Sequence, residues 1–600
     1  MSLFRSRRAR TIVVALAAGS LALTGCSSGS GNNGGKDKSN TQDDALVQSK
    51  PIEYGNAKDS TGPAEPVKGA RDGGTIRVYQ EDDFSHLDPG QIYVSDAGLL
   101  SRLIHRGLTQ FQEDEKGNKK VVGDLATNAG EESDEGKTWK YTLKDGIKDE
   151  DGDPITSADV RHSVERLYTK FISDGPVYLQ QWLSGGGTKY RDALPDGPYK
   201  GDHLPDSVLE TPDEKTIIFK FKEPQPDLPQ ALTMPGYSVV PEKKDTKEKY
   251  DSAPKALGPY KIAEFKRGKS MKLVKNKHWD EKTDSVRHQY VDGFNITFNH
   301  DRADQTKRLL ADRGESKNGV QFSGSVDSTQ VKNVVDDPEA SKRTVRGYQP
   351  YVWQLNMNMD RIKDKRIRDA ITYALPNAQI LRPDGGTYGG EPAGGLLAPT
   401  LPGYEKGYDP YGKLDKPNGD PEKAKKLLKE AGKEGMKLTY AYANVPHRQQ
   451  QAVIIEKALE KAGFDVQKKD IDQATWYEQV GKVDNKLDVY MTGWGQDWPS
   501  ISTVIPPVYD GEEIQDGAAN YSHINDKHVN SEIVRIKKIT DPEEATKAWI
   551  KLHKYIVEEV NPAAPMYFTK QLQIFGSNIG GARYSTVTSY IDVTRLYLKK

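Results

Sequence analysis

The sequence predicts a large α/β protein built on mixed sheets. Short segments alternate apolar and polar residues like strands, as in Ile76 and Val78 against Arg77 and Tyr79. Capped helical segments lie between these strands, and long irregular connections join them. The 600 residues would fill about four domains at about 150 residues each, and the 35% hydrophobic content supplies a core under a polar surface. No internal repeat of 20–50 residues appears.

The predicted strands and helices follow one another in mixed order. Strands are expected at 76–79, 139–143, 216–221, 464–469 and 487–492, with a hairpin formed by 260–265 and 271–275. Helices are expected after Thr156, from Pro421 to Ala431, from Arg448 to Ala462 and within 542–560. Thr156 with Asp159 imitates a capping box, and Asp420 precedes a proline that favours a helix start.

Composition excludes several classes of protein. Lys and Arg together number 86 and Asp and Glu 87, which leaves a formal net charge of −1 and argues against a general nucleic-acid binder. The single cysteine rules out an intramolecular disulfide, a cysteine-based zinc site and an iron–sulfur cluster.

The N-terminus predicts export from the cytoplasm. Four arginines lie within residues 1–10, and residues 11–23 are small and apolar, so residues 1–25 are expected to be a signal peptide. The apolar run is shorter than the roughly 20 residues that a transmembrane helix needs. Arg7-Arg8 leaves both general secretion and twin-arginine export open.

The only cysteine, Cys26, ends this run in the sequence L-T-G-C. That sequence resembles the lipobox of bacterial lipoproteins, which implies that Cys26 is acylated and anchors the chain to the membrane. Residues 26–72 are rich in Ser, Gly, Asn, Lys and Asp, so they are expected to form a lipidated, disordered tether.

Motifs of catalysis and metal binding are near misses. Residues 149–153 begin like an EF-hand, but Pro154 and Val160 stand where that loop needs Gly and Glu, so a turn is expected. Residues 263–270 lack the first Gly of a phosphate-binding loop and lie within the predicted hairpin. His523 and His528 are expected to be surface histidines rather than metal ligands. The sequence therefore predicts no catalytic residue, no metal and no cofactor.

Six blocks in order resemble the family 5 solute-binding proteins of ABC importers, the oligopeptide, dipeptide and nickel group. They are G-G-T-I-R-V with L-D-P at 87–89; D-L-A-T-N at 124–128 with 138–148 and D-G-D-P-I-T-S-A-D-V-R-H-S-V-E-R at 151–166; G-P-Y-K-I at 258–262 with K-N-K-H-W; W-Q-L-N-M-N-M at 353–359 with 364–375; D-P-E-K-A-K-K-L-L-K-E-A-G at 420–432; and G-W-G-Q-D-W-P at 493–499. Together they span about 73–580. One departure, Leu375-Pro376-Asn377, predicts a local helix break.

The resemblance implies a periplasmic-binding-protein-like fold with three lobes and ligand enclosed between them. Lobe I would comprise 73–100, 211–325 and 561–600, the inserted lobe II 101–210, and lobe III 326–560. It also implies a monomeric, non-enzymatic, extracytoplasmic subunit that captures peptides and delivers them to the transmembrane permease of an ABC importer.

The resemblance also names ligand-binding residues. In similar peptide binders an Asp follows the Gly-Trp pair after two residues, which here is Asp497, expected to pair with the peptide's α-ammonium. Its expected companions in the ligand site are Gly493, Trp494, Gly495, Trp498, Trp476 and Tyr567. No residue stands out as the partner of a peptide C-terminus, which favours oligopeptides slightly over dipeptides.

Other ligands stay open for the same transport role. An oligosaccharide would use the abundant aromatic residues for stacking, and a nickel chelate is a third option. A neutral sugar has no ammonium for Asp497 to pair with, so this residue distinguishes a peptide ligand from an oligosaccharide. A secreted hydrolase is disfavoured because the sequence has no nucleophile motif and no metal constellation.

Overall fold

The computed structural model describes residues 50–600. The predicted signal peptide, Cys26 and the tether up to residue 49 lie outside the described residues. Three main sheets organise the described chain, and each defines one lobe. No helix of residues 50–600 is both long enough and apolar enough to cross a membrane.

Lobe I is built on a five-stranded sheet in the order β12-β2-β11-β10-β9. Its strands are β2 Thr75–Tyr79, β9 Tyr260–Lys266, β10 Ser270–Lys275, β11 Gly293–Thr297 and β12 Gly319–Gln321. Ile76 and Val78 of β2 point into a core that also takes the apolar face of helix α3, Ser95–Ile104. The predicted hairpin is β9–β10, and α7 Arg302–Ala311, α8 Val331–Asp336 and α9 Pro338–Ser341 follow later in the chain.

Lobe II has a four-stranded sheet, β5-β6-β8-β7, and a three-stranded sheet, β1-β4-β3. The strands are β5 Glu131–Ser133, β6 Thr138–Thr142, β7 Leu209–Glu210, β8 Thr216–Lys220, β1 Glu53–Tyr54, β3 Thr109–Glu113 and β4 Lys119–Gly123. Its helices are α2 Ala57–Ser60, α4 Ser157–Arg166, α5 Tyr178–Ser184 and α6 Leu228–Ala231. The predicted capping box is present, since the Thr156 amide donates to Asp159 at 2.8 Å.

Two predicted boundaries around this lobe are wrong. A lobe that ends at residue 210 would cut its own sheet, because β8 pairs with β6 and the shared core reaches Leu257. The prediction of a disordered tether fails for residues 50–72, because β1 pairs with β4 and Ile52 and Val67 are buried. A few apolar side chains and backbone hydrogen bonds are enough to order this polar segment.

Lobe III is built on a six-stranded sheet in the order β14-β18-β13-β17-β15-β16. Its strands are β13 Thr344–Met357, β14 Gly390–Pro392, β15 Lys437–Ala443, β16 Asp465–Ile471, β17 Val489–Gly495 and β18 Ala563–Ile574. Its helices are α10 Lys365–Ala374, α11 Asn377–Ile380, α12 Pro421–Glu430, α13 Pro446–Lys461, α14 Trp476–Val480, α15 Ile505–Tyr509, α16 Lys527–Ile536 and α17 Pro542–Tyr555. The predicted helix break lies between α10 and α11.

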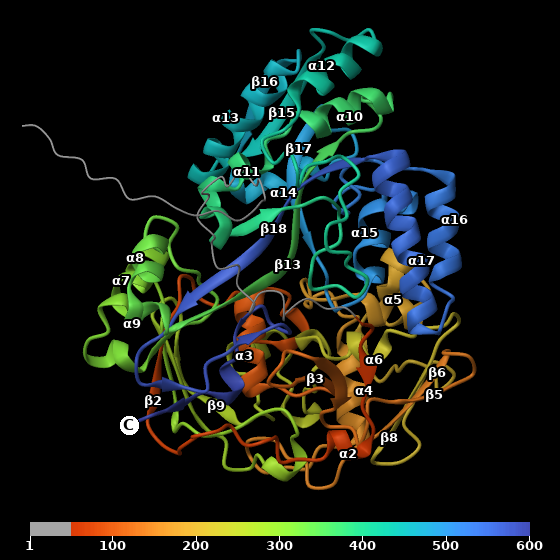
Figure 1. Cartoon of the computed structure of the whole chain (residues 1–600). Helices are drawn as coiled ribbons and strands as arrows, with labels where there is room; N and C mark the ends of the chain where they lie inside the picture. Colours follow the sequence, from red (N-terminus) through yellow and green to blue (C-terminus); the bar gives the residue numbers. More distant parts are fainter. Residues whose placement is uncertain (1–49) are drawn as a thin grey trace, which may run out of the picture. The chain divides into compact units, whose positions relative to one another are not determined.

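Two long strands connect lobe III with lobe I. β13 and β18 run side by side in antiparallel pairing (Figure 1), and their pairing shifts register between Tyr348 and Val352. Leu355 and Ala564 pack in the core of lobe III, whereas Val345 and Ile574 pack beside lobe I strands. The assignment of all of 561–600 to lobe I is therefore wrong for most of β18. The short pairs β19 Ile579–Gly580 with β22 Tyr597–Leu598, and β20 Tyr584–Ser585 with β21 Tyr590–Ile591, complete the chain.

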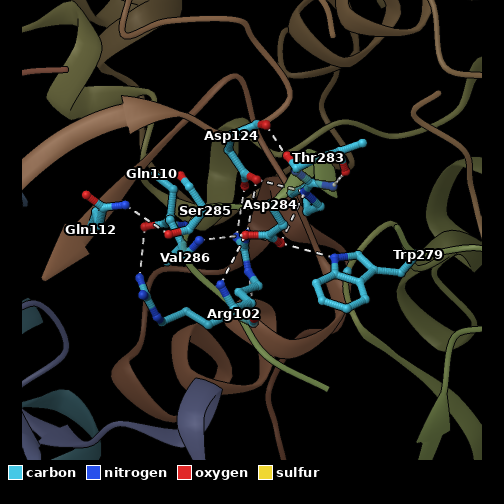
Figure 2. A network of polar contacts seen from close by, with 12 residues as sticks. Arg102, Gln110, Gln112, Asp124, Trp279, Thr283, Asp284, Ser285 and Val286 are labelled. Atoms are coloured by element: carbon cyan, nitrogen blue, oxygen red, sulfur yellow. Dashed lines mark hydrogen bonds and ion pairs between the residues drawn. The ribbon is translucent and has the colours of Figure 1, made fainter. Parts of the chain in front are cut away.

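A buried ion network joins lobes I and II. Asp124, which follows β4, accepts hydrogen bonds from Arg106 at 2.7 Å and from both terminal nitrogens of Arg287 at 2.9 and 3.0 Å. Asp284 accepts from Arg287 at 3.0 Å and from the Trp279 indole at 3.1 Å (Figure 2). Burial alone would raise the pKa of Asp284, but Arg287 and Arg106 hold it well below its ordinary value. Four charges that are almost fully buried thus satisfy one another at the junction.

This network predicts a large loss of stability when one charge is removed. Asp124→Asn leaves Arg106 and Arg287 with one carboxylate fewer in a buried site, so the free energy of unfolding should fall by about 3–5 kcal/mol. Asp336→Asn removes one partner of the exposed pair Lys332–Asp336 and should change it by less than about 1 kcal/mol. Urea denaturation of both variants checks this, and equal effects would contradict the structural role of the network.

Candidate ligand-binding site

Two cavities lie beside β17 and the loop that follows it. The first, of about 220 Å³, is lined by Asp497, Tyr93 and Tyr351 among others, and draws residues from both ends of the chain. The second, of about 290 Å³, is lined by Trp353, Trp476 and Arg448 among others. Two predicted site residues, Asp497 and Trp476, line these cavities, one in each.

Three lobes meet at Asp497, just beyond the end of β17. Its carboxylate accepts a hydrogen bond from the Tyr93 hydroxyl of lobe I at 2.9 Å and another from the Tyr178 hydroxyl of lobe II. Tyr93 precedes α3 and Tyr178 is the first residue of α5. Within residues 50–600 no Lys, Arg or His pairs with this carboxylate. Asp497 is therefore a partly buried carboxylate bound by neutral hydroxyls.

The electrostatics of this residue follow from its surroundings. Burial raises the pKa of Asp497 above its ordinary value of 3.8, and the hydrogen bonds from Tyr178 and Tyr93 offset only part of that shift. Burial and the nearby carboxylate in turn raise the pKa of Tyr178, which stays a neutral donor. No cation of residues 50–600 is bonded to the Asp497 carboxylate, and a cationic ligand group would supply one.

Gly493 and Gly495 make room for aromatic rings of the neighbouring strand. A Cβ atom on Gly495 would lie 2.6 Å from the Tyr351 ring, and one on Gly493 would lie 3.0 Å from the Trp353 ring. Each glycine is paired across the sheet with the residue whose ring covers it. Tyr351 and Trp353, which line the first and second cavity respectively, thus cover these glycines, and ligand contact by Gly493 and Gly495 stays a prediction.

The second cavity has a cationic wall. Arg448, near the start of α13, lies over the Trp353 ring at 3.7 Å and donates to Gln451 at 2.7 Å and to the Tyr567 hydroxyl at 2.9 Å. Burial alone would lower the pKa of Arg448, but Tyr567 and Asp384 raise it, so this side chain stays charged. His447 lines the same cavity, and burial and the adjacent Arg448 lower its pKa. Sequence reasoning missed both residues, although Arg448 begins a predicted helix and His447 directly precedes it.

The other predicted site residues line neither cavity. Trp494 faces the opposite side of β17, where its indole donates to the Thr503 carbonyl at 2.9 Å. Trp498 is 2% exposed in the core of lobe II, packs on Tyr178 and donates to Asp227 at 3.2 Å. Tyr567 is fully buried behind the second cavity and donates to Asp384 at 2.7 Å. Ligand contact by these three residues stays a prediction.

The EF-hand near miss forms a turn and His528 is exposed, but the prediction of a surface position is wrong for His523, which is buried. Asp149 accepts from the backbone amides of residues 151–153, which closes a turn. His523 bonds to Asp360 at 2.8 Å, and the described part of the chain has no cluster of three His, Cys, Asp or Glu side chains that could hold a metal ion.

Comparison with known proteins identifies the family. The description "Bacterial extracellular solute-binding proteins, family 5 Middle" matches residues 120–516. This chain belongs to the family 5 extracellular solute-binding proteins. Members of family 5 are extracytoplasmic, non-enzymatic binding proteins of transport, so the predicted family, the absence of catalysis and the solute-binding role are confirmed.

Relatives within family 5 match nearly the whole described chain. This chain is 21% identical over 533 residues to the glutathione-binding protein GsiB of Salmonella typhi, and the match covers 86% of this chain and 93% of GsiB. It is 23% identical over 521 residues to the oligopeptide-binding protein OppA of Bacillus subtilis, covering 84% and 90%.

Solved structures confirm the predicted family 5 fold. Clavulanic acid biosynthesis oligopeptide binding protein 2 matches with a TM-score of 0.82 at 26% identity, over 93% of this chain and all of that one. DppA from Helicobacter pylori in complex with the peptide STSA matches with a TM-score of 0.66 at 19% identity, over 88% and 99%.

The raised pKa of Asp497 predicts how stability depends on pH without ligand. Between the ordinary value and the raised folded value, the folded protein holds a proton that the unfolded chain has released, so this residue's contribution to stability falls as pH rises. Asp497→Asn lacks this titration. The free energy of unfolding of the variant minus that of the parent should therefore increase as pH rises from about 4. This difference should become constant above the raised pKa.

Denaturant titrations of both ligand-free proteins at several pH values measure this difference. A variant that loses stability relative to the parent as pH rises would mean that the Asp497 carboxylate stabilises the ligand-free fold.

Proposed function

We propose that this chain is the lipid-anchored, peptide-binding subunit of an ABC importer, which delivers short oligopeptides to the permease. The observation that carries the proposal is the Asp497 carboxylate, partly buried among three lobes with no cationic partner in residues 50–600. An α-ammonium is the group that a peptide of any sequence offers to such an anion. The names of the oligopeptide-binding relatives support the same ligand class.

The second cavity supplies a partner for the other end of the peptide. Arg448 lies 3.7 Å from the Asp384 carboxylate, and it has donors beyond those bonded to Gln451 and Tyr567. A guanidinium binds a carboxylate with two parallel hydrogen bonds. Asp497 and Met491, which lines the second cavity, are six residues apart, so the two cavities are separated by no more than about 20 Å. An extended peptide of up to about six residues would span them.

The membrane anchor is part of the proposal. Cys26 follows an apolar run in L-T-G-C, and the structure describes the chain from residue 50, so residues 26–49 would link the acylated cysteine to the folded body. A chain of this length holds the binding cleft within reach of a permease in the same membrane.

Replacement of the anchor residue tests the location. Cys26→Ser should release the protein into the medium or leave unprocessed precursor, because the thiol that takes the lipid is gone. Fractionation of cells that produce the parent and the variant, followed by mass spectrometry of the mature N-terminus, measures this. Unchanged membrane retention with normal cleavage after Gly25 would contradict the lipoprotein proposal.

Replacement of the ammonium partner tests the ligand. Asp497→Asn keeps the size of the side chain and removes its charge, so a bound α-ammonium would lose its counter-ion in a partly buried site. The loss should be about 3–5 kcal/mol, or about two to three decades in affinity for free peptides. Calorimetric titration with Ala tripeptides to hexapeptides measures this. N-acetylated peptides should bind both proteins weakly, because they lack the cation.

A matched control separates charge from general perturbation. Asp360→Asn alters a carboxylate whose side chain is 69% exposed and lines neither cavity, so peptide affinity should stay at the parent's value. If Asp497→Asn binds free peptides as tightly as the parent does, Asp497 is not the ammonium partner. If the parent binds a cello- or chito-oligosaccharide and no peptide, or binds only a nickel chelate, the importer takes that ligand instead.

A further inference from the structure

The first cavity extends beyond Asp497 to the end of helix α3 in lobe I. There it is lined by Arg102, in the last turn of the helix, and by His105, which follows the helix. The cavity therefore has a carboxylate at its lobe III wall and a guanidinium at its lobe I wall. Neither charge takes part in an ion pair within residues 50–600.

Arg102 differs from the other buried arginines nearby. Arg106 and Arg287 share the carboxylates of Asp124 and Asp284, whereas the Arg102 guanidinium makes one hydrogen bond, to the neutral amide oxygen of Gln110 at 2.8 Å. Figure 2 shows Arg102 reaching toward Gln110, on the side away from Asp124 and Asp284. A guanidinium has five N–H donors, so most of its donors have no partner among these side chains.

Asp592 and Glu113, whose negative charges favour the charged form of Arg102, already have partners. Asp592 pairs with Arg583 at 3.0 Å, and Glu113 lies 3.7 Å from the same arginine and accepts from Thr586. Their field favours the charged form of Arg102, while burial lowers its pKa. The Arg102 side chain is only partly withdrawn from water, and a carboxylate in the cavity would give its free N–H donors a charged partner.

His105 supplies a second, buried polar group without a partner at this wall. It is 2% exposed, its Nδ1 lies 3.2 Å from the Ser101 hydroxyl, and its Nε2 has no hydrogen-bond partner. Burial lowers the pKa of His105 to about 3, so the ring is neutral and offers a hydrogen bond rather than a charge. An unpartnered nitrogen is uncommon inside a protein, so His105 Nε2 is available to a group that binds beside Arg102.

The size of the cavity limits what joins its two charged walls. At about 220 Å³ it is smaller than the roughly 300–1,000 Å³ of sites that enclose a whole small ligand. It suits one residue of a longer ligand. A first peptide residue in this cavity would place its ammonium at Asp497 and direct an acidic side chain toward Arg102.

We propose that Arg102, with His105 beside it, binds a carboxylate on the first residue of the ligand, so that the protein prefers peptides beginning with Glu or Asp. This inference rests on the peptide-binding function proposed above. It adds a selectivity that backbone recognition alone does not provide, because hydrogen bonds to a peptide backbone do not distinguish side chains.

Calorimetric titration with Glu-Ala-Ala, Gln-Ala-Ala and Lys-Ala-Ala tests the preference. The parent should bind Glu-Ala-Ala about 10- to 100-fold tighter than Gln-Ala-Ala, the range for a charge-assisted hydrogen-bonded pair, and Lys-Ala-Ala weakest. Arg102→Gln should bind Glu-Ala-Ala and Gln-Ala-Ala alike, with its affinity for Gln-Ala-Ala close to that of the parent. Arg535→Gln, an exposed arginine of α16 that lines neither cavity, should keep the preference.

The outcomes separate this inference from the function on which it rests. If Arg102→Gln does not fold, the ratio of Glu-Ala-Ala to Gln-Ala-Ala affinities in the parent still decides. Tight peptide binding by the parent with no preference for Glu overturns the selectivity and leaves the peptide function intact. A preference that persists in Arg102→Gln overturns the assignment to Arg102. No binding of any peptide overturns both proposals.

Discussion

The burial of the Asp497 carboxylate is the constraint on which the site depends. An anion leaves water at a cost, and here two tyrosine hydroxyls from two other lobes compensate only part of it. The hydroxyls reach Asp497 only if lobes I, II and III are in contact. The buried network of Arg106, Arg287 and their carboxylates holds lobes I and II together. Lobe III is therefore the part that carries Asp497 to its partners in the other two lobes.

Local patterns predicted much of the fold because its strands and helix caps are local. The alternation in β2, the capping box at Thr156, the β9–β10 hairpin and the break at Pro376 all lie where the sequence indicates. The lobe boundaries were harder, since β8 and β18 join sheets through partners far away in the chain. Residues 50–72 have a polar composition, and their order depends on β4, which no local pattern shows.

The candidate site was predicted only in part, for a similar reason. The resemblance to the family led to Asp497 and Trp476, and both line cavities. Strict alternation along β17 would have placed Trp494 on the face opposite Gly493 and Gly495. Tyr93 and Tyr178 stand 404 and 319 positions before Asp497, and nothing in their own segments indicates that they bind it.

Adjacent residues of the loop after β17 act in opposite directions on the contact of lobe III with the other two lobes, which we call closure. Trp498 buries an indole in the core of lobe II, bonds to Asp227 and favours closure, while Asp497 loses water and opposes it. A ligand shifts such an equilibrium only through its different affinity for the two states. A cation at Asp497 removes the desolvation cost that opposes closure and leaves the burial of Trp498, which favours it. The same six-residue segment, Gly493–Trp498, would thus couple recognition of a positive charge to closure of the lobes, without any change in the sheet from which it extends.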